Sequence, residues 1–303
     1  MSGARPEKIG VDPPERARSP AVDSFTSDGL RFDVTEYGAS STDGIPVLLL
    51  HGFPQTAASW EPVARRLADA GHRVLVPDQR GYSPGARPAG RRAYRVEELV
   101  DDVVALLDAA GGGPAHVVGH DWGAVVGWAL AALHPERVRT LTAVSVPHPA
   151  AFVKAMVTSR QVALSWYMYA FQLPGVAERV LGRPGGLATA ARRAGQSPQR
   201  ARRDEAALAA KGGLRPAVTG AVNWYRAMPF WEHRGLQLTV SAPTLLVWSD
   251  GDVAISRAAV DGTPRWVTGP YRLEVLSGVS HWIPDEVPDR LADLVLEHVA
   301  ERG

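Results

Sequence analysis

The feature that most constrains the fold is a short turn, Gly119-His120-Asp121-Trp122-Gly123-Ala124. The run before it, 115–118, is typical of a buried strand, and the apolar segment after it, 125–133, is long enough for a helix. The turn has the form G-x-nucleophile-x-G, in which small residues let a strand fold sharply into a helix. Its middle residue is an aspartate. A Gly-rich connection with an acid at the helix N-terminus explains the turn alone equally well.

Apolar runs and amphipathic segments alternate on both sides of this turn. The runs predict strands buried on both faces, and the amphipathic segments predict helices between them. This order is typical of a mostly parallel sheet with helices on both faces. The strands are expected at 45–50, 73–76, 115–118, 138–146, 243–248 and 271–276, and the helices at 60–70, 96–110, 256–261 and 287–299. An alternating segment, 30–37, predicts a half-buried strand paired with a short one near Phe25.

The strand pattern is interrupted from 150 to 235, where helical propensity and aromatic residues prevail. We expect a helical cap at 150–235, inserted between two parts of the sheet-containing core at 25–149 and 236–303. An Arg-rich stretch, 183–203, is interpreted as a solvated helix surface and not as a nucleic-acid face, because acidic residues and alanines interleave.

Composition excludes several classes of protein. The formal net charge is +1, so nothing indicates a polyanionic partner, and the chain has no cysteine for disulfides or thiolate metal sites. The polar, Pro-rich segment 1–24 reads as a loose N-terminal arm without the apolar region of a secretory signal. No run approaches the roughly 18 apolar residues of a membrane span. We therefore expect a cytoplasmic protein with neither a membrane nor a nucleic acid as partner; a homo-oligomer remains open.

Three chemically useful groups follow apolar strands in a fixed order: Asp121, an acid near Asp252, and His281. In open parallel sheets the carboxyl ends of the strands form the edge where ligands bind. Nucleophile, acid and histidine in this order are the arrangement of the fold built around a nucleophile elbow. The three together make a catalytic interpretation of the Asp121 turn much stronger.

The chain resembles the α/β-hydrolases and, among them, the epoxide hydrolases with an aspartate nucleophile. The resemblance runs from about Phe25 to the C-terminus, and the segments that carry it are His51-Gly52-Phe53-Pro54, Asp78-Gln79-Arg80-Gly81-Tyr82-Ser83, Gly119-His120-Asp121-Trp122-Gly123, 248–252 and Gly278-Val279-Ser280-His281-Trp282. It implies a hydrolase acting on ether bonds that needs no cofactor and no metal.

Two cap segments also resemble the epoxide hydrolases, which carry a ring-opening tyrosine in each. Asn223-Trp224-Tyr225-Arg226 places one on Tyr225. The segment 166–175 places the other on Tyr167, with Tyr169 as the alternative. Each could instead be an amphipathic tyrosine packed in the cap core.

The resemblance implies a mechanism in two steps. Asp121 would attack an epoxide carbon and form an alkyl ester, while Tyr167 and Tyr225 assist the departing oxygen. His281, oriented by Asp252, would then activate the water that cleaves the ester to a vicinal diol. Backbone N–H groups of Phe53 and Trp122 would stabilise the oxyanion. By the same resemblance the Phe53–Pro54 peptide bond is expected to be cis.

Some assignments have close competitors. Asp250 also follows the strand at 243–248, but the family spacing favours Asp252 as the acid, with Ser249 standing where the family has glycine. His51 and His120 are interpreted as structural residues of backbone turns. The substrate pocket is expected to be apolar and partly aromatic, lined by Trp166, Phe171, Trp224 and Trp282.

Two other functions are compatible with the chain. A haloalkane or haloacid dehalogenase would use the same aspartate and histidine, but Phe53 lacks the side-chain donor for a halide and two tyrosines suit an alkoxide better. A hydrolase fold kept as a non-catalytic small-molecule receptor is the more remote alternative. Neither the natural substrate and its stereochemistry, nor a role in detoxification or in secondary metabolism, can be inferred from the residues.

Overall fold

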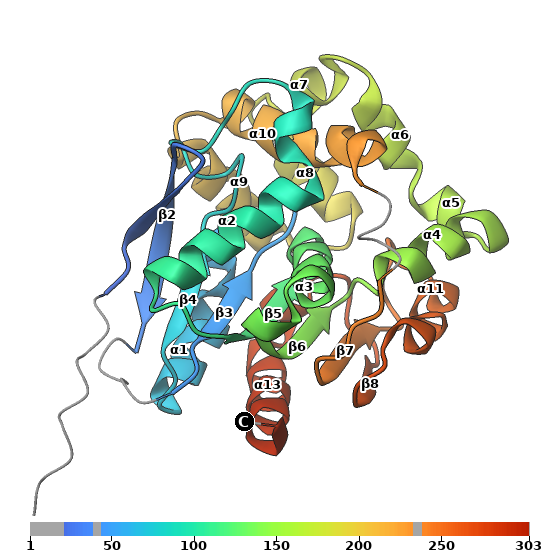
Figure 1. Cartoon of the computed structure of the whole chain (residues 1–303). Helices are drawn as coiled ribbons and strands as arrows, with labels where there is room; N and C mark the ends of the chain where they lie inside the picture. The colour runs from blue at the N-terminus through green and yellow to red at the C-terminus, as the bar shows by residue number, and fades with distance from the viewer. Residues whose placement is uncertain (1–20, 39–43, 233–237, 303) are drawn as a thin grey trace, which may run out of the picture.

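The sheet at the centre of the molecule has eight strands in the order β1-β2-β4-β3-β5-β6-β7-β8. The computed structural model describes residues 21–38, 44–232 and 238–302 (Figure 1). β1 pairs antiparallel with β2, and β2 with β4, whereas the pairs from β4 to β8 are parallel. The strands are β1 Ser24–Ser27, β2 Leu30–Tyr37, β3 Val47–Leu50, β4 Val74–Pro77, β5 Ala115–His120, β6 Val138–Val144, β7 Thr244–Ser249 and β8 Tyr271–Leu276. The predicted mostly parallel sheet is confirmed.

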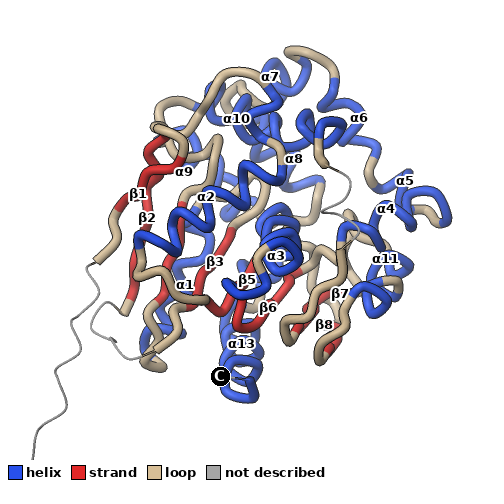
Figure 2. Tube along the Cα trace, in the orientation of Figure 1, coloured by secondary structure: helices blue, strands red, loops and turns tan. Residues whose placement is uncertain are grey.

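Helices cover both faces of this sheet, as Figure 2 shows. Their bounds are α1 Glu61–Asp69, α2 Val96–Ala109, α3 Trp122–Leu133, α11 Arg257–Asp261, α12 Ile283–Glu286 and α13 Pro288–Arg302. Successive side chains of a strand point to opposite faces, so β3 contributes to two cores. Leu48 and Leu50 join the core that includes α2 and α3, while Val47 and Leu49 join the core of α1 and α13. Burial of both faces explains why β3, β4, β5 and β7 read as continuous apolar runs.

The described residues also form short 3-10 helices, four in the core and one, η4, in the cap. They are η1 Ala57–Trp60, η2 Arg91–Tyr94, η3 Pro135–Arg137, η4 Met228–Phe230 and η6 Thr263–Trp266. Most of the predicted N-terminal arm, 1–20, lies outside the described residues. Its last part is not loose, because Val22 is buried and its N–H donates to Glu36 at 2.7 Å.

A helical cap is inserted between β6 and β7 and lies over one end of the sheet (Figure 1). Its helices are α4 Pro149–Thr158, α5 Gln161–Leu164, α6 Trp166–Gln172, α7 Val176–Val180, α8 Gly186–Arg193, α9 Pro198–Ala210 and α10 Leu214–Ala227. We propose 150–235 as its limits, as the sequence suggests, although 233–237 lie outside the described residues. Among the described residues, the helices lack the combination of length and apolarity that crossing a bilayer requires.

Strand register brings the predicted catalytic groups to one edge. Leu50 pairs with Gly119, and His120 with Val144, so β3, β5 and β6 end at the same level. Ser249 at the end of β7 pairs with Leu276 at the end of β8. The loops that carry Asp121, Asp252 and His281 therefore leave the sheet at its carboxyl edge, below the cap.

Candidate active site

Asp121 occupies a sharp turn between β5 and α3. Its φ of 52° lies in the left-handed region, which a residue with a side chain rarely adopts and which only surrounding structure can impose. A Cβ atom on Gly119 would overlap the carbonyl of Gly123, and one on Gly123 would overlap the carbonyl of Leu50. The two glycines thus permit the close approach that the turn needs, and the geometry is that of a nucleophile elbow.

His281 lies between two carboxylates. Its Nε2 is 3.5 Å from Oδ2 of Asp121, and its Nδ1 is 2.8 Å from Oδ2 of Asp252. All three residues are largely buried, with side-chain exposures of 7% for His281, 15% for Asp121 and 0% for Asp252. The arrangement can orient the imidazole through one nitrogen and leave the other facing the Asp121 carboxyl.

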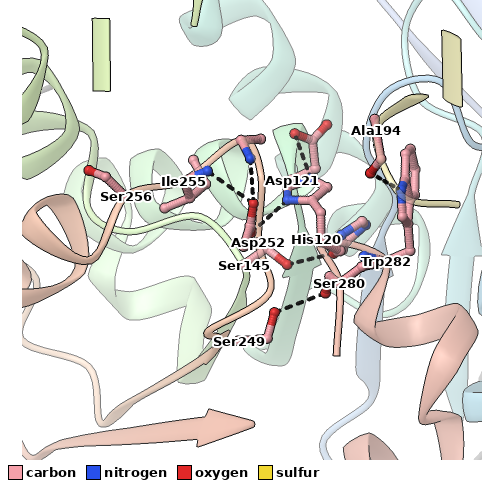
Figure 3. Close-up of polar contacts among 12 residues, drawn as sticks. His120, Asp121, Ser145, Ala194, Ser249, Asp252, Ile255, Ser256, Ser280 and Trp282 are labelled. Atoms are coloured by element: carbon pink, nitrogen blue, oxygen red, sulfur yellow. Dashed lines mark hydrogen bonds and ion pairs between the residues drawn. The ribbon is translucent and has the colours of Figure 1, made fainter. Parts of the chain in front are cut away.

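Asp252, and not Asp250, is the acid that contacts the histidine. The second oxygen of Asp252, Oδ1, accepts from the backbone N–H groups of Ala254 at 2.7 Å and Ile255 at 2.9 Å, as Figure 3 shows for Ile255. Asp250 instead closes a surface turn, where it accepts from the N–H of Gly278 at 2.8 Å and from the hydroxyl of Ser277. The structure thus agrees with the family spacing.

Side chains from neighbouring elements hold the loop of His281 by hydrogen bonds to its backbone carbonyl groups. Nε2 of His120 and Oγ of Ser145 both lie 2.9 Å from the carbonyl oxygen of His281, and Ser249 donates to the carbonyl of Ser280 (Figure 3). Burial, followed by the charge of His281, lowers the pKa of His120 to about 4. A neutral, buried His120 that holds a backbone carbonyl fits the structural role expected of it.

Two backbone N–H groups point at the Asp121 carboxyl. The N–H of Phe53 donates to Oδ1 of Asp121 at 2.7 Å, and a backbone hydrogen bond from Trp122 helps to lower the pKa of the same carboxyl. The Phe53–Pro54 bond is cis, as expected. The structure therefore brings the two predicted oxyanion donors to the carboxyl where a tetrahedral oxyanion would form.

Charge coupling sets the protonation of the pair. Burial raises the pKa of Asp121, but the hydrogen bond with His281 and the charge of His281 outweigh it and leave that pKa below its usual value. Burial likewise lowers the pKa of His281, while the charge of Asp252 and hydrogen bonds to both aspartates raise it to about 10. With an empty site at neutral pH, His281 is cationic and Asp121 is anionic.

Aromatic side chains from core and cap enclose the Asp121 carboxyl. Tyr225 on α10 meets Trp122, Phe171 and Phe53 edge-on, with ring centroids 4.8, 5.0 and 5.4 Å apart. Tyr167 on α6 lies 6.0 Å from Tyr225 by the same measure. The structure therefore brings together both predicted tyrosines, the predicted pocket residue Phe171, and Asp121.

Both tyrosines are held protonated. Burial, then the charges of Asp121 and Asp252, raises the pKa of Tyr167, which a hydrogen bond with Tyr225 partly offsets. Burial, then Tyr167 and Asp121, raises the pKa of Tyr225, against a side-chain hydrogen bond from Trp122. Tyr169, the alternative to Tyr167, is 58% exposed. The inward position on α6 therefore belongs to Tyr167.

The prediction that Trp166 lines the pocket is wrong. Its side chain is 68% exposed, because Tyr167 and Phe171, four residues apart, occupy the inward face of α6 and the preceding residue is turned away. That orientation depends on packing, which a short aromatic segment does not reveal.

Trp224 and Trp282 are buried where cap and core meet. The indole N–H of Trp224 donates to the carbonyl of Arg80 at 2.7 Å, and that of Trp282 to the carbonyl of Ala194 at 2.9 Å. Trp224 packs edge-on against Trp122, and Trp282 against His281. Their contacts join cap and core, and their part in lining the pocket stays a prediction.

Sequence reasoning missed the group that holds the two tyrosines together. Arg226, next to Tyr225, makes two bonds of 2.6 and 3.0 Å with Glu178 of α7 and donates to the carbonyl of Phe171. Gln172, next to Phe171, donates to the carbonyl of Tyr225 at 2.8 Å. The sequence did hold a signal for this pair: Glu178 is the single acid between 150 and 203, so it had to be a partner for one of the many arginines.

Among the described residues, no group of three or more His, Cys, Asp or Glu side chains could hold a metal ion.

Comparison with known proteins agrees with this geometry. The family model for the alpha/beta hydrolase fold matches residues 45–288. Epoxide hydrolase A from Mycobacterium tuberculosis is 34% identical over 89% of this chain and 94% of its own length. AB hydrolase superfamily protein YfhM from Bacillus subtilis is also 34% identical, over 86% of this chain and 92% of its own. The structure of epoxide hydrolase A from Mycobacterium thermoresistibile, 30% identical, matches 91% of this chain and 97% of its own with a TM-score of 0.73. The chain therefore belongs to the α/β-hydrolase fold family and, within it, to the epoxide hydrolases.

Proposed function

We propose that the protein opens a hydrophobic epoxide to a vicinal diol through a covalent ester on Asp121. The observation that carries this proposal is a pair of protonated tyrosines, buried Tyr225 and partly buried Tyr167, close enough to the Asp121 carboxylate for its charge to raise the pKa of both. That carboxylate is in turn coupled to His281. An epoxide bound between them would have its carbon near the carboxylate and its oxygen near the phenols.

In the first step, an oxygen of the Asp121 carboxylate forms a bond to an epoxide carbon as the ring C–O bond breaks. The freed alkoxide is a poor leaving group unless it receives a hydrogen bond or a proton. Tyr167 and Tyr225 supply this assistance, since their raised pKa values keep both hydroxyls protonated at neutral pH. The product is a neutral alkyl ester.

Formation of the ester changes the charge around His281. The hydrogen bond and charge of Asp121 contribute to the raised pKa of His281, and both are lost once Asp121 is esterified. The pKa of His281 then falls, and the imidazole loses its proton. Because the epoxide oxygen gains one proton, the number of protons in the site is unchanged. The imidazole thus becomes a base only when there is an ester to hydrolyse.

In the second step, neutral His281 removes a proton from water, which attacks the carboxyl carbon of Asp121. The N–H groups of Phe53 and Trp122 stabilise the resulting oxyanion. Asp252 holds the imidazole and stabilises its cationic form. Collapse of the intermediate releases the diol, and the oxygen of the water stays in the Asp121 carboxylate.

One observation weighs against the dehalogenase alternative. A halide would need donors beside the nucleophile, and Trp122 is the natural one. The only donor of that side chain is its indole N–H, which is engaged in a hydrogen bond with Tyr225. The residue at position 53 is phenylalanine, whose side chain has no polar group to donate to a halide.

Trapping the ester tests the proposal. His281→Gln should accumulate a covalent adduct with styrene oxide, seen by intact-protein mass spectrometry and located at Asp121 by peptide mapping. Wild-type protein should turn over without a stable adduct, and the double variant with Asp121→Asn should form none. A folded His281→Gln protein that neither turns over nor carries an adduct would overturn the proposal and favour the receptor alternative.

A further inference from the structure

The outer helices of the cap expose an unusual number of large apolar side chains. Seven of the eleven such side chains that are exposed among the described residues fall within 153–180, on α4 to α7. They are Val153 (54%), Val157 (83%), Val162 (44%), Trp166 (68%), Tyr169 (58%), Leu173 (55%) and Val180 (48%). Isolated exposed apolar residues need no explanation, but a concentration of them in one part of the fold marks an interaction surface.

The spacing of these residues puts them on the outward sides of their helices. Val153 and Val157 are four apart on α4, whereas Ala151 and Ala155 of the same helix are buried. On α6, Trp166 and Tyr169 are exposed, while Tyr167 packs against the core. These helices therefore have two apolar sides, one facing the core and one facing solvent.

Charge is distributed very unevenly around this surface. Residues 150–211 hold ten basic and three acidic residues, which leaves 23 and 29 for the rest of the chain, so the two parts carry net charges of +7 and −6. None of the three acids is exposed. Glu178 pairs with Arg226, Asp204 pairs with Arg203, and Glu205 accepts from two backbone N–H groups of α8 and the turn before it.

Exposed cations interleave with the exposed apolar residues. Lys154 lies between Val153 and Val157, and Arg160 precedes Val162. Arg179 and Arg183 flank the end of α7. We call this set, the seven apolar side chains together with these four cations, the cap outer face; α4 to α7 follow one another along the outer border of the cap in Figure 1.

We propose that the cap outer face docks on an anionic lipid surface. Apolar side chains that enter the headgroup region, surrounded by Lys and Arg that attract anionic lipids, are the recognition chemistry of proteins that lie on a bilayer. A second copy of the chain fits less well, because a two-fold contact would set one positive surface against another. A nucleic acid would use the cations and aromatic rings but not the exposed valines and leucine.

This inference goes beyond the proposed function and does not depend on it. The sequence suggested no membrane partner, on the ground that no apolar run could span a bilayer, and docking on a surface requires no such run. The consequence for the site is spatial. α6 carries Trp166 on its outward side and Tyr167 on its inward side, so a bilayer-dissolved apolar substrate would meet the helix that also lines the site.

Vesicle binding by the full chain tests the proposal. We expect the protein to float with vesicles of phosphatidylcholine mixed with phosphatidylserine, far less with phosphatidylcholine alone, and less as salt is raised. Lys154→Gln with Arg160→Gln should weaken binding about fivefold per cation. Val153→Ser with Val157→Ser should also weaken it, whereas Leu133→Ser with Val275→Ser, exposed apolar residues of the core domain, should not.

Trp166 provides a second readout in the same samples. It is the most exposed of the nine tryptophans, the others being buried or half-buried, so lipids brominated near the headgroup should quench mainly its fluorescence. Trp166→Phe should remove the quenching while binding persists.

Any of four outcomes would overturn the proposal. The first is equal flotation with anionic and neutral vesicles, or none with either. The second is binding that both pairs of cap substitutions leave unchanged. The third is a concentration-dependent dimer, detected by light scattering and abolished by Val153→Ser with Val157→Ser, which would assign the face to a second copy. Tighter binding to an oligonucleotide than to anionic vesicles would assign the cations to nucleic acid instead.

Discussion

At the scale of single residues, Asp121 combines a strained backbone conformation with a charge that is coupled to His281. Asp121 is held at a positive φ beside two backbone donors, and its charge is matched by a histidine whose pKa stands at about 10. In the proposed mechanism, the coupling that keeps Asp121 ionised for attack also keeps His281 protonated until the ester has formed. The proposed reaction follows from a change of charge at one residue.

The roles proposed for Tyr167 and Tyr225 can be tested with Tyr169 as a control, since Tyr169 lies on α6 beside Tyr167. Tyr167→Phe and Tyr225→Phe should each slow ester formation, by about 10²-fold to 10⁴-fold when combined, because the alkoxide loses its acid assistance. Pre-steady-state measurement of the ester with styrene oxide gives the rate. Tyr169→Phe, which alters an exposed hydroxyl, should leave it unchanged. Full activity in the double variant would contradict the role of the pair.

The pKa of His281 should follow the charge at position 121. In the wild type it should titrate at about 10, so the imidazole is cationic below that pH and neutral above it. Asp121→Asn removes one of the charges that raise this pKa and should lower it markedly. Nuclear magnetic resonance of the imidazole, on protein whose mass confirms Asn at position 121, measures both values.

Asp250→Asn is the matched control, since Asp250 closes a surface turn and should leave the pKa of His281 unchanged. The stability that His281 contributes is present below its ordinary pKa of about 6.5 and is lost as the pH rises through its raised value. An unshifted pKa in Asp121→Asn would contradict the proposed switch from cation to base.

The positions of the three candidate catalytic residues could be predicted because each residue follows the end of an apolar strand. Asp121, Asp252 and His281 follow β5, β7 and β8 in the expected order, and the parallel sheet alone places them at one edge. Trp166 could not be placed in the same way. Which side of a seven-residue helix faces inward depends on contacts with distant elements such as α10.

At the scale of elements, the cap positions its tyrosines by joining α6, α7 and α10. Arg226 on α10 binds Glu178 on α7 and the carbonyl oxygens of Phe171 and Leu173 at the end of α6. Strands β3 to β8 were predicted from apolar runs, β2 from alternation, and the longer helices from amphipathic periodicity. The short helices α5 and α7 lack a periodicity of their own, since two turns or fewer are stabilised by tertiary packing.

Breaking the Arg226–Glu178 pair should destabilise the fold. Each side chain is 10% exposed, so Arg226→Met leaves a buried carboxylate unpaired and should lower the free energy of unfolding by about 3 kcal/mol. Urea denaturation measures the change. The double variant with Glu178→Met should recover part of it, because no buried charge then remains.

Arg65→Met is the control for this prediction. Arg65 pairs with Glu61 on the surface of α1, with exposures of 65% and 49%, and the change should leave the free energy of unfolding almost unchanged. If Arg65→Met and Arg226→Met lowered the free energy of unfolding equally, the buried Arg226–Glu178 pair would stabilise the fold no more than a surface pair does.

At the scale of the whole molecule, cap and core meet through buried polar contacts. Asp204 of α9 and Asp285 of α12 share Arg203 and the amide groups of Gln55 and Gln196. These contacts, with the two buried indole N–H bonds, close the site from above. The sequence predicted an inserted cap but not these contacts, because all of them except those of Asp204 with Arg203 and Gln196 join residues 82 to 230 positions apart.

The central claim is that the oxygen added to the substrate comes from Asp121 and not directly from water. A single turnover of styrene oxide by excess enzyme in heavy-oxygen water tests it most directly, with mass spectrometry of the diol and of the Asp121 peptide. The account predicts an unlabelled first-turnover diol and one heavy oxygen in the Asp121 carboxylate. A labelled diol from the first turnover, with Asp121 unlabelled, would contradict it.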